Sequence, residues 1–110
     1  MLLADTATGA TAGATAGASA ASGAPGASLT TTRAGSWVWG VGTDWDASRA
    51  RAVGLAQTLV DQYLPPAGDT YWLQRQTGPT ATSGTVVTIN DTAPTTDRWD
   101  LALIEVLAAP

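Results

Sequence analysis

Residues 57–76 read QTLVDQYLPPAGDTYWLQRQ, and this stretch decides the fold class. Two runs rich in β-branched and aromatic residues, 57–64 and 69–76, flank the connection PPAG at 65–68. Proline presets the backbone angle that a tight turn needs and glycine accepts a positive φ, so a short connection of this composition favours a hairpin. The stretch therefore predicts two antiparallel strands joined by a turn.

A strand with two unlike faces is expected at residues 36–42, SWVWGVG. A period of two puts both of its tryptophans and Val41 on one face. Gly40 and Gly42 fall on the other face, which leaves room there for a bulge or for close approach of another backbone segment. Because large aromatic side chains are mostly buried, we expect these tryptophans, and Trp99 further on, to be core residues.

The other expected strands are short and separated by Gly, Pro, Thr and Asp. They are SLTTT at 28–32, TVVTIN at 85–90 and WDLALIEVL at 99–107. The last run is apolar on both faces, which suggests a central strand covered on two sides or facing a partner, with a short helix as the alternative. Residues 43–56 have poor apolar periodicity and predict a loop with one helical turn at most. About six short strands without βα alternation indicate an all-β fold, an antiparallel β-sandwich of jelly-roll-like or Ig-like type.

The N-terminal part of the chain differs in composition. Residues 4–26, ADTATGATAGATAGASAASGAPG, carry no large apolar side chain, so ordering them would lose backbone entropy with little burial in return. We therefore expect a low-complexity, flexible linker or loop over residues 1–26 and a β-sandwich module over residues 27–110. The opening MLLAD lacks the basic and apolar regions of a signal peptide.

Charge and composition argue against several classes of function. The chain has five Lys and Arg residues against nine Asp and Glu residues, a net charge of −4, and its cations are scattered, so nucleic acid and anionic membrane surfaces are not expected partners. It contains no Cys and no His, which excludes Ser-His-Asp and Cys-His catalysis and zinc sites with those ligands. The only glutamate, Glu105, lies in the last expected strand, where a glycosidase-type carboxylate pair is not indicated. We expect no enzyme activity and no required cofactor.

Aspartates in two expected loops are the candidate metal ligands. Asp44 and Asp46 lie two residues apart, and Asp91 lies in another turn-rich stretch. Loop carboxylates on a β-sandwich can bind Ca²⁺, which prefers several oxygen ligands from flexible segments. In the simpler interpretation Asp44 caps a turn, Asp46 pairs with Arg49, and Asp91 stabilises a turn through its side chain.

Tryptophan and tyrosine are the other candidate binding residues. Five Trp and two Tyr occur without any Phe. Each joins a large apolar face to a polar group, and such rings stack on sugars or anchor protein contacts. Trp45, in a loop between two aspartates, is the best candidate for an exposed ring. Tyr71 or Trp72, whichever faces outward, comes next.

The segments GVGTDW at 40–45 and VTINDTAP at 87–94 carry a resemblance to a known group of proteins. Over residues 20–107 the chain resembles an uncharacterised β-sandwich module of bacterial secreted or cell-surface proteins. It looks like the second half of a longer jelly-roll-like or Ig-like unit. No catalytic residue is attached to this resemblance. It implies an extracellular or cell-surface location and a non-catalytic structural or accessory role.

Two further functional hypotheses stay open at this point. One is a carbohydrate- or ligand-binding sandwich that uses exposed Trp and Tyr side chains, with a polysaccharide or a protein as partner. The other is a fragment of a larger enzyme whose catalytic groups lie upstream. In that case some strands would lack their usual cover, which favours a homo-oligomer.

Overall fold

The hairpin predicted over residues 57–76 is confirmed by the computed structural model, which describes residues 13–109 of the chain. Strand β5 (Gln57–Tyr63) pairs antiparallel with β6 (Thr70–Gln76). Gly68 in the connecting turn has a φ of 94°, a conformation that glycine adopts without steric penalty. The turn places Tyr63 directly opposite Tyr71.

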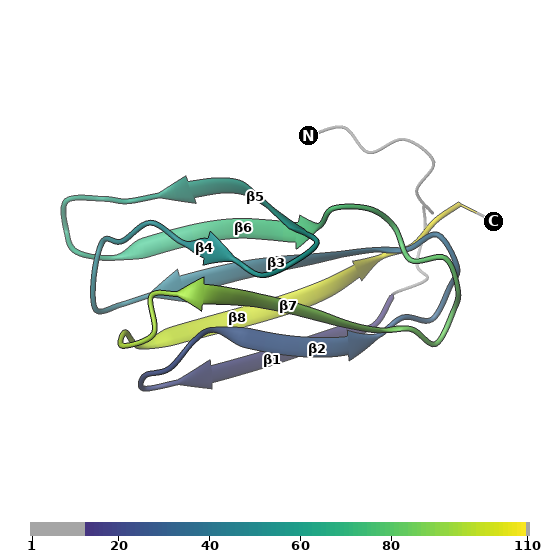
Figure 1. Cartoon of the computed structure of the whole chain (residues 1–110), viewed down its shortest axis with the longest axis horizontal. Coiled ribbons are helices and arrows are strands. Elements are labelled where there is room, and N and C mark those ends of the chain that lie inside the picture. The colour runs from purple at the N-terminus through teal and green to yellow at the C-terminus, as the bar shows by residue number, and fades with distance from the viewer. Residues whose placement is uncertain (1–12, 110) are drawn as a thin grey trace.

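Eight strands build two antiparallel sheets that pack face to face (Figure 1). In the larger sheet, β1 (Thr15–Ala20), β8 (Trp99–Val106) and β3 (Trp37–Asp44) lie side by side, followed by β6 and β5. The smaller sheet consists of β2 (Gly26–Thr30), β7 (Val86–Ala93) and β4 (Ala52–Val53), in that order. The all-β sandwich is thus confirmed, with eight strands instead of about six. The nested pairing of β1 with β8, β2 with β7 and β3 with β6 is that of a jelly roll.

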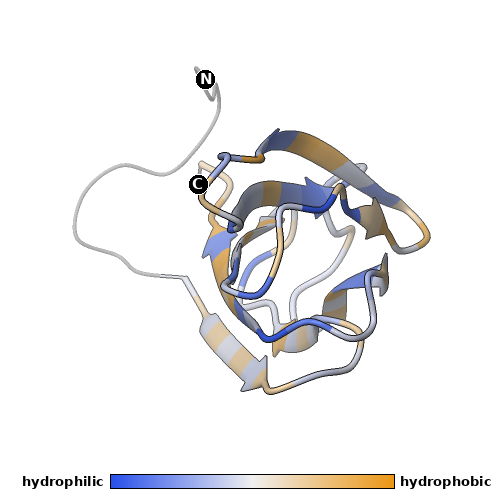
Figure 2. Cartoon of the chain, turned by 90° about the vertical axis from the view of Figure 1, so that its left-hand side faces the viewer, coloured by the Kyte–Doolittle hydropathy of each residue, from blue (hydrophilic) through white to orange (hydrophobic). Residues whose placement is uncertain are grey.

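The prediction of a linker was wrong for part of the low-complexity tract, because residues 15–20 form an edge strand of the larger sheet. Strand β1 pairs with β8, with Ala16 opposite Leu103 and Ala18 opposite Leu101. Its alanines pack on the core, while Thr, Gly and Ser alternate with them on the outer side. The alternation in hydropathy appears as bands along β1 in Figure 2. Backbone pairing with β8 supplies the stabilisation that the small side chains alone could not. Residues 4–12 of the tract lie outside the described residues.

A hydrophobic core fills the space between the sheets on the side of β1, β2 and β8. Trp99 belongs to it, as predicted from the sequence. Its eight buried members come from β2, β3, β6, β7 and β8: Leu29, Val38, Trp72, Val87, Ile89, Trp99, Leu101 and Leu103.

Strand β3 turns its glycines, and not its tryptophans, toward this core. A β-carbon on Gly40 would lie 2.9 Å from Ile89 Cγ2, so side chains fill the room on the glycine face, and not the backbone or bulge that was predicted. Trp37 and Trp39 lie on the opposite, outer face of the sheet. The prediction that Trp39 is buried is confirmed, whereas Trp37 is only half-buried. The Arg75 guanidinium packs over both rings, 5.7 Å from the ring centroid of Trp39 and 4.8 Å from that of Trp37.

Beneath β5 and β6 the interior is polar. Trp72 Nε1 donates to Gln74 Oε1 at 2.7 Å, and Gln74 Nε2 donates to Gln57 Oε1 at 2.8 Å. Gln57 Nε2 in turn donates to Asn90 Oδ1 at 2.7 Å, which joins the larger sheet to β7. This network replaces apolar packing where β4 is only two residues long.

Candidate binding face of the larger sheet

The outer face of the larger sheet carries a continuous row of cross-strand neighbours. Tyr63 of β5 lies opposite Tyr71 of β6, and Tyr71 lies opposite Thr43 of β3. Thr43 is paired with Asp100 of β8, and Asp100 with Ser19 of β1. Because alternate residues of a strand share a face, these side chains all point away from the core. The row crosses all five strands.

Two exposed tyrosines form one end of this row. Tyr63 is 63% exposed and Tyr71 is 44% exposed. Their ring centroids lie 6.4 Å apart with an interplanar angle of 22°, so the rings are stacked nearly parallel. The Tyr71 hydroxyl donates to Asp69 Oδ2 at 3.3 Å, which restricts the ring orientation. The pair offers apolar ring surface with hydroxyl groups at its margin.

A shallow hollow of about 240 Å³ adjoins the two tyrosines. Val41, Thr43 and Leu73 lie along its lining, and Asp61 is the one carboxylate that the described part of the chain places there. Val41 is 54% exposed although it lies in the middle of a sheet. An apolar surface rimmed by a few polar groups is the composition expected of a binding site for an uncharged ligand.

A second hollow, of about 250 Å³, lies at the other end of the row. It is lined by Ser19 and Asp100, which belong to the row, and by Trp45 and Arg98 from the loops beside it. Trp45 follows β3 directly and is 51% exposed.

The structure separates the three predicted ligand-binding residues. Trp45 and Tyr71 are exposed and lie at the two hollows, so both are available for contact. Trp72 points into the sandwich, where the Arg51 guanidinium lies 4.2 Å from its ring centroid. The sequence analysis missed Tyr63. Counting outward from the centre of the PPAG turn would pair Tyr63 with Thr70, so the turn alone did not indicate the observed pairing of Tyr63 with Tyr71.

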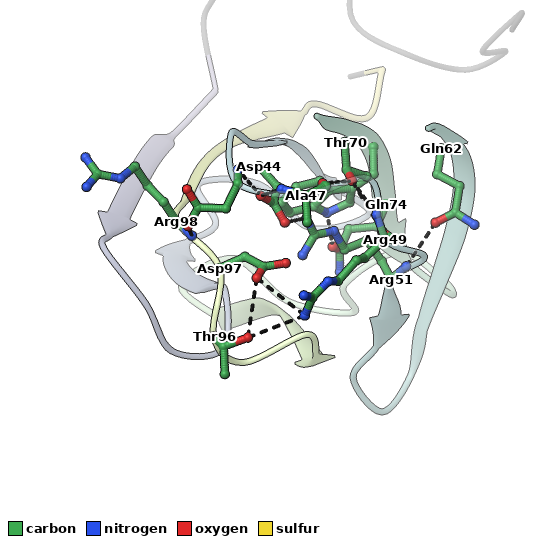
Figure 3. Close-up of polar contacts among 12 residues, drawn as sticks. Asp44, Ala47, Arg49, Arg51, Gln62, Thr70, Gln74, Thr96, Asp97 and Arg98 are labelled. Carbon is green, nitrogen blue, oxygen red and sulfur yellow. Dashed lines mark hydrogen bonds and ion pairs between the residues drawn. The ribbon is translucent and has the colours of Figure 1, made fainter. Parts of the chain in front are cut away.

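Asp44 is held in a buried ion pair and a turn. Its Oδ2 accepts a hydrogen bond from Arg51 Nη2, with both side chains almost fully buried (Figure 3). Its Oδ1 accepts from the Asp46 and Ala47 amides at 2.8 and 3.2 Å, which confirms the predicted turn-capping role. Burial alone would raise the pKa of Asp44, but the Asp46 amide and Arg51 hold it below its usual value.

The other predicted calcium ligands have separate surroundings. Asp46 Oδ2 accepts from the Arg98 amide at 2.7 Å, and Arg49 pairs with Asp97 instead of the expected Asp46. Asp91 lies in β7 and points into the interior. Over residues 13–109, no group of three or more His, Cys, Asp or Glu side chains could hold a metal ion.

Asp91 is a buried carboxylate with no hydrogen-bond partner among residues 13–109. Neither of its oxygens accepts a hydrogen bond from any described residue. Gln74 is its neighbour, but Gln74 Nε2 donates to Gln57 Oε1 and to Asn90 O instead. Burial raises the pKa of Asp91 to about 7, against the lowering influence of the Arg51 guanidinium and the Gln74 amide.

Asp97 is a further buried aspartate and lies beside the Asp44 carboxylate. Its Oδ1 pairs with Arg49 Nη1 at 3.5 Å, while its Oδ2 has no partner within the described range (Figure 3). Burial, and then the neighbouring Asp44 carboxylate, raise the pKa of Asp97. Asp44, Asp91 and Asp97 are all buried in the interior, and none of the three lines either hollow.

Comparison with known proteins found no matching family model, no similar curated protein and no similar solved structure. In the described part of the chain, no helix is long and apolar enough to cross a membrane.

Proposed function

We propose that this chain is a non-catalytic, carbohydrate-binding accessory module, and that the outer face of its larger sheet binds a polysaccharide of uncharged sugars. The observation that carries the proposal is the stacked, exposed pair Tyr63 and Tyr71 beside a shallow hollow. Sugar rings present flat arrays of C–H groups, and aromatic faces stack on them without needing charge.

The chemistry of the hollow supports a sugar over a purely apolar ligand. Asp61 and Thr43 stand in its lining beside the apolar Val41 and Leu73. A carboxylate and a hydroxyl accept and donate the hydrogen bonds that sugar hydroxyls require. Among the described residues, no Lys or Arg side chain lines this hollow, and the net charge of −4 disfavours acidic polymers.

The same lining supports binding without hydrolysis. Glycoside hydrolysis generally uses two carboxyl groups on either side of the scissile bond. Within residues 13–109, Asp61 is the single carboxylate at this hollow. A structural polysaccharide as ligand agrees with the extracellular or cell-surface location that the resemblance implies, and the module would then hold a larger exported protein on that polymer.

Affinity electrophoresis against soluble polysaccharides, followed by calorimetric titration of the retained polymer, tests the proposal. The panel contains hydroxyethylcellulose, xylan, glucomannan, amylose and, as acidic controls, alginate and polygalacturonate. We expect retention by at least one neutral polymer. Tyr71→Ala should weaken that binding about tenfold, the equivalent of one lost stacking contact.

The control variant is Val86→Ala, which removes a 66% exposed apolar side chain from the smaller sheet. It should bind like the unaltered protein, and both variants should unfold at the same urea concentration as the parent within error. Retention by none of the neutral polymers, or undiminished binding by Tyr71→Ala, contradicts the proposal. A dimer in sedimentation equilibrium that dissociates on Tyr71→Ala would instead identify the face as a self-association surface.

A further inference from the structure

The two hollows lie on one line across the sheet. Tyr71 and Thr43 line the first, Asp100 and Ser19 line the second, and Thr43 is the direct cross-strand neighbour of Asp100. With strands about 4.8 Å apart, Tyr71 and Asp100 are separated by about 10 Å, and Tyr63 and Ser19 by about 19 Å. Strands β3 and β8, which carry Thr43 and Asp100, are neighbours in the sheet, so no other strand of the described residues separates the two hollows.

Each end of the line offers an exposed ring together with hydrogen-bonding groups. The stacked tyrosines and Asp61 provide these at the first hollow. Trp45 provides the ring at the second, where Asp100 and the exposed Arg98 provide the polar groups. An exposed aromatic ring beside hydrogen-bonding side chains, the combination proposed to bind a sugar, is therefore present at both hollows.

The loop that carries Trp45 is held in place from behind. Asp44, fixed by Arg51, accepts hydrogen bonds from the amides of Asp46 and Ala47 on the far side of Trp45. Asp46 in turn accepts from the Arg98 amide, which joins this loop to the loop before β8. A ring held in this way loses little conformational entropy on binding, which favours its use as a recognition group.

We propose that the two hollows are subsites of one track, and that the ligand is a linear polysaccharide lying across the strands from Tyr63 to Trp45. The inference rests on the proposed function and adds the direction, the length and the second aromatic contact of the ligand. An extended chain of sugar units spans the separation between the subsites, whereas a mono- or disaccharide occupies one of them.

The test is calorimetric titration of the full chain with oligosaccharides of increasing length. Cello-, xylo- and manno-oligosaccharides from disaccharide to hexasaccharide serve as probes. Affinity should rise by about tenfold once the chain reaches the second hollow, as expected for one additional stacked ring. Trp45→Ala should abolish this rise and leave the affinity for the shortest bound oligosaccharide unchanged. Tyr71→Ala should weaken both.

Three outcomes separate this inference from the function on which it rests. Binding that does not depend on chain length, or an unchanged length dependence in Trp45→Ala, overturns the track and leaves a single sugar site at the tyrosines. Binding of no oligosaccharide and no polymer overturns both. Trp45→Phe should restore the length dependence, because the phenyl ring keeps the stacking surface. Urea midpoints of the Trp45 variants equal to that of Val86→Ala ensure that misfolding is not the cause.

Discussion

The indole of Trp72 packs directly against Gly42 of the neighbouring strand, so closely that a β-carbon on Gly42 would lie 2.1 Å from Trp72 Cζ2. The two residues are cross-strand partners in the larger sheet. The absence of a side chain at Gly42 therefore allows Trp72 to lie flat in the interior, where it contacts Arg51 and Gln74.

Replacing this glycine should destabilise the fold. In Gly42→Ala the new methyl group collides with the Trp72 ring, which cannot move without breaking its hydrogen bond to Gln74, and we expect a loss of about 3 kcal/mol in the free energy of unfolding. Gly17→Ala on edge strand β1 is the control, because its β-carbon would meet only Leu101 O at 3.5 Å. Urea titration followed by tryptophan fluorescence measures both. Equal stability of the two variants would contradict the packing argument.

Removing the cation of the buried ion pair should also be strongly destabilising. Arg51→Met leaves Asp44 charged and buried, and we expect a loss of about 4 kcal/mol. Arg49→Met is the matched control, since the Arg49 side chain is 55% exposed and its pairing with Asp97 should contribute under about 1 kcal/mol. Adding Asp44→Asn to Arg51→Met should recover part of the stability, because asparagine keeps the turn cap without the charge. A loss no larger than that of Arg49→Met would refute a stabilising role for the pair.

The buried carboxyl group of Asp91 should make the protein less stable as the pH rises toward neutrality. Its pKa is about 7 in the folded state and near 3.8 when unfolded, so between these values the folded state holds a proton that the unfolded state releases. The free energy of unfolding therefore falls as pH increases over this interval and stays low above it. Relative to the parent, Asp91→Asn should gain about 4 kcal/mol between pH 4 and pH 8. Urea midpoints at both pH values measure this gain, and exposed Asp61→Asn should lack it.

The carboxyl group of Glu105 should have the opposite effect and make the protein less stable as the pH falls into the acid range. Burial would raise its pKa, but hydrogen bonds from Ala14 and Thr32 outweigh burial and lower it to about 2. A depressed pKa contributes stability above the unfolded value of 4.5, and this stability is lost as pH falls toward 2. Glu105→Gln places an amide among these donors and should lose about 3 kcal/mol at neutral pH, with less acid sensitivity than the parent.

The control for Glu105 lies on the same strand. Asp100→Asn changes an exposed carboxyl group of β8 and should alter neutral-pH stability by less than about 0.5 kcal/mol. Thermal unfolding followed by circular dichroism at pH 3 and pH 7 compares the variants. A Glu105→Gln protein as stable as Asp100→Asn at pH 7 would show that the carboxylate does not hold the ends of β1 and β2 to β8.

The sequence by itself determined the strands whose signals are local. The PPAG turn and the alternating runs around it predict β5 and β6, and the same reasoning predicts β3, β7 and β8. Turn chemistry and the period of two act over a few residues, so no partner is needed to recognise them. The absence of His and Cys likewise removed whole classes of catalytic and metal site.

Only the tertiary structure decided which strand faces are buried and that part of the low-complexity tract forms a strand. Periodicity assigns Trp37 and Trp39 to one face of β3 but cannot say that the glycine face is the inner one, because that depends on Trp72 and Ile89 from other strands. The Ala/Thr/Gly tract becomes β1 only because β8 offers it an edge to pair with. Tyr63, Tyr71 and Trp45 lie on one face through the register of five strands, a relationship between distant residues that no local pattern contains.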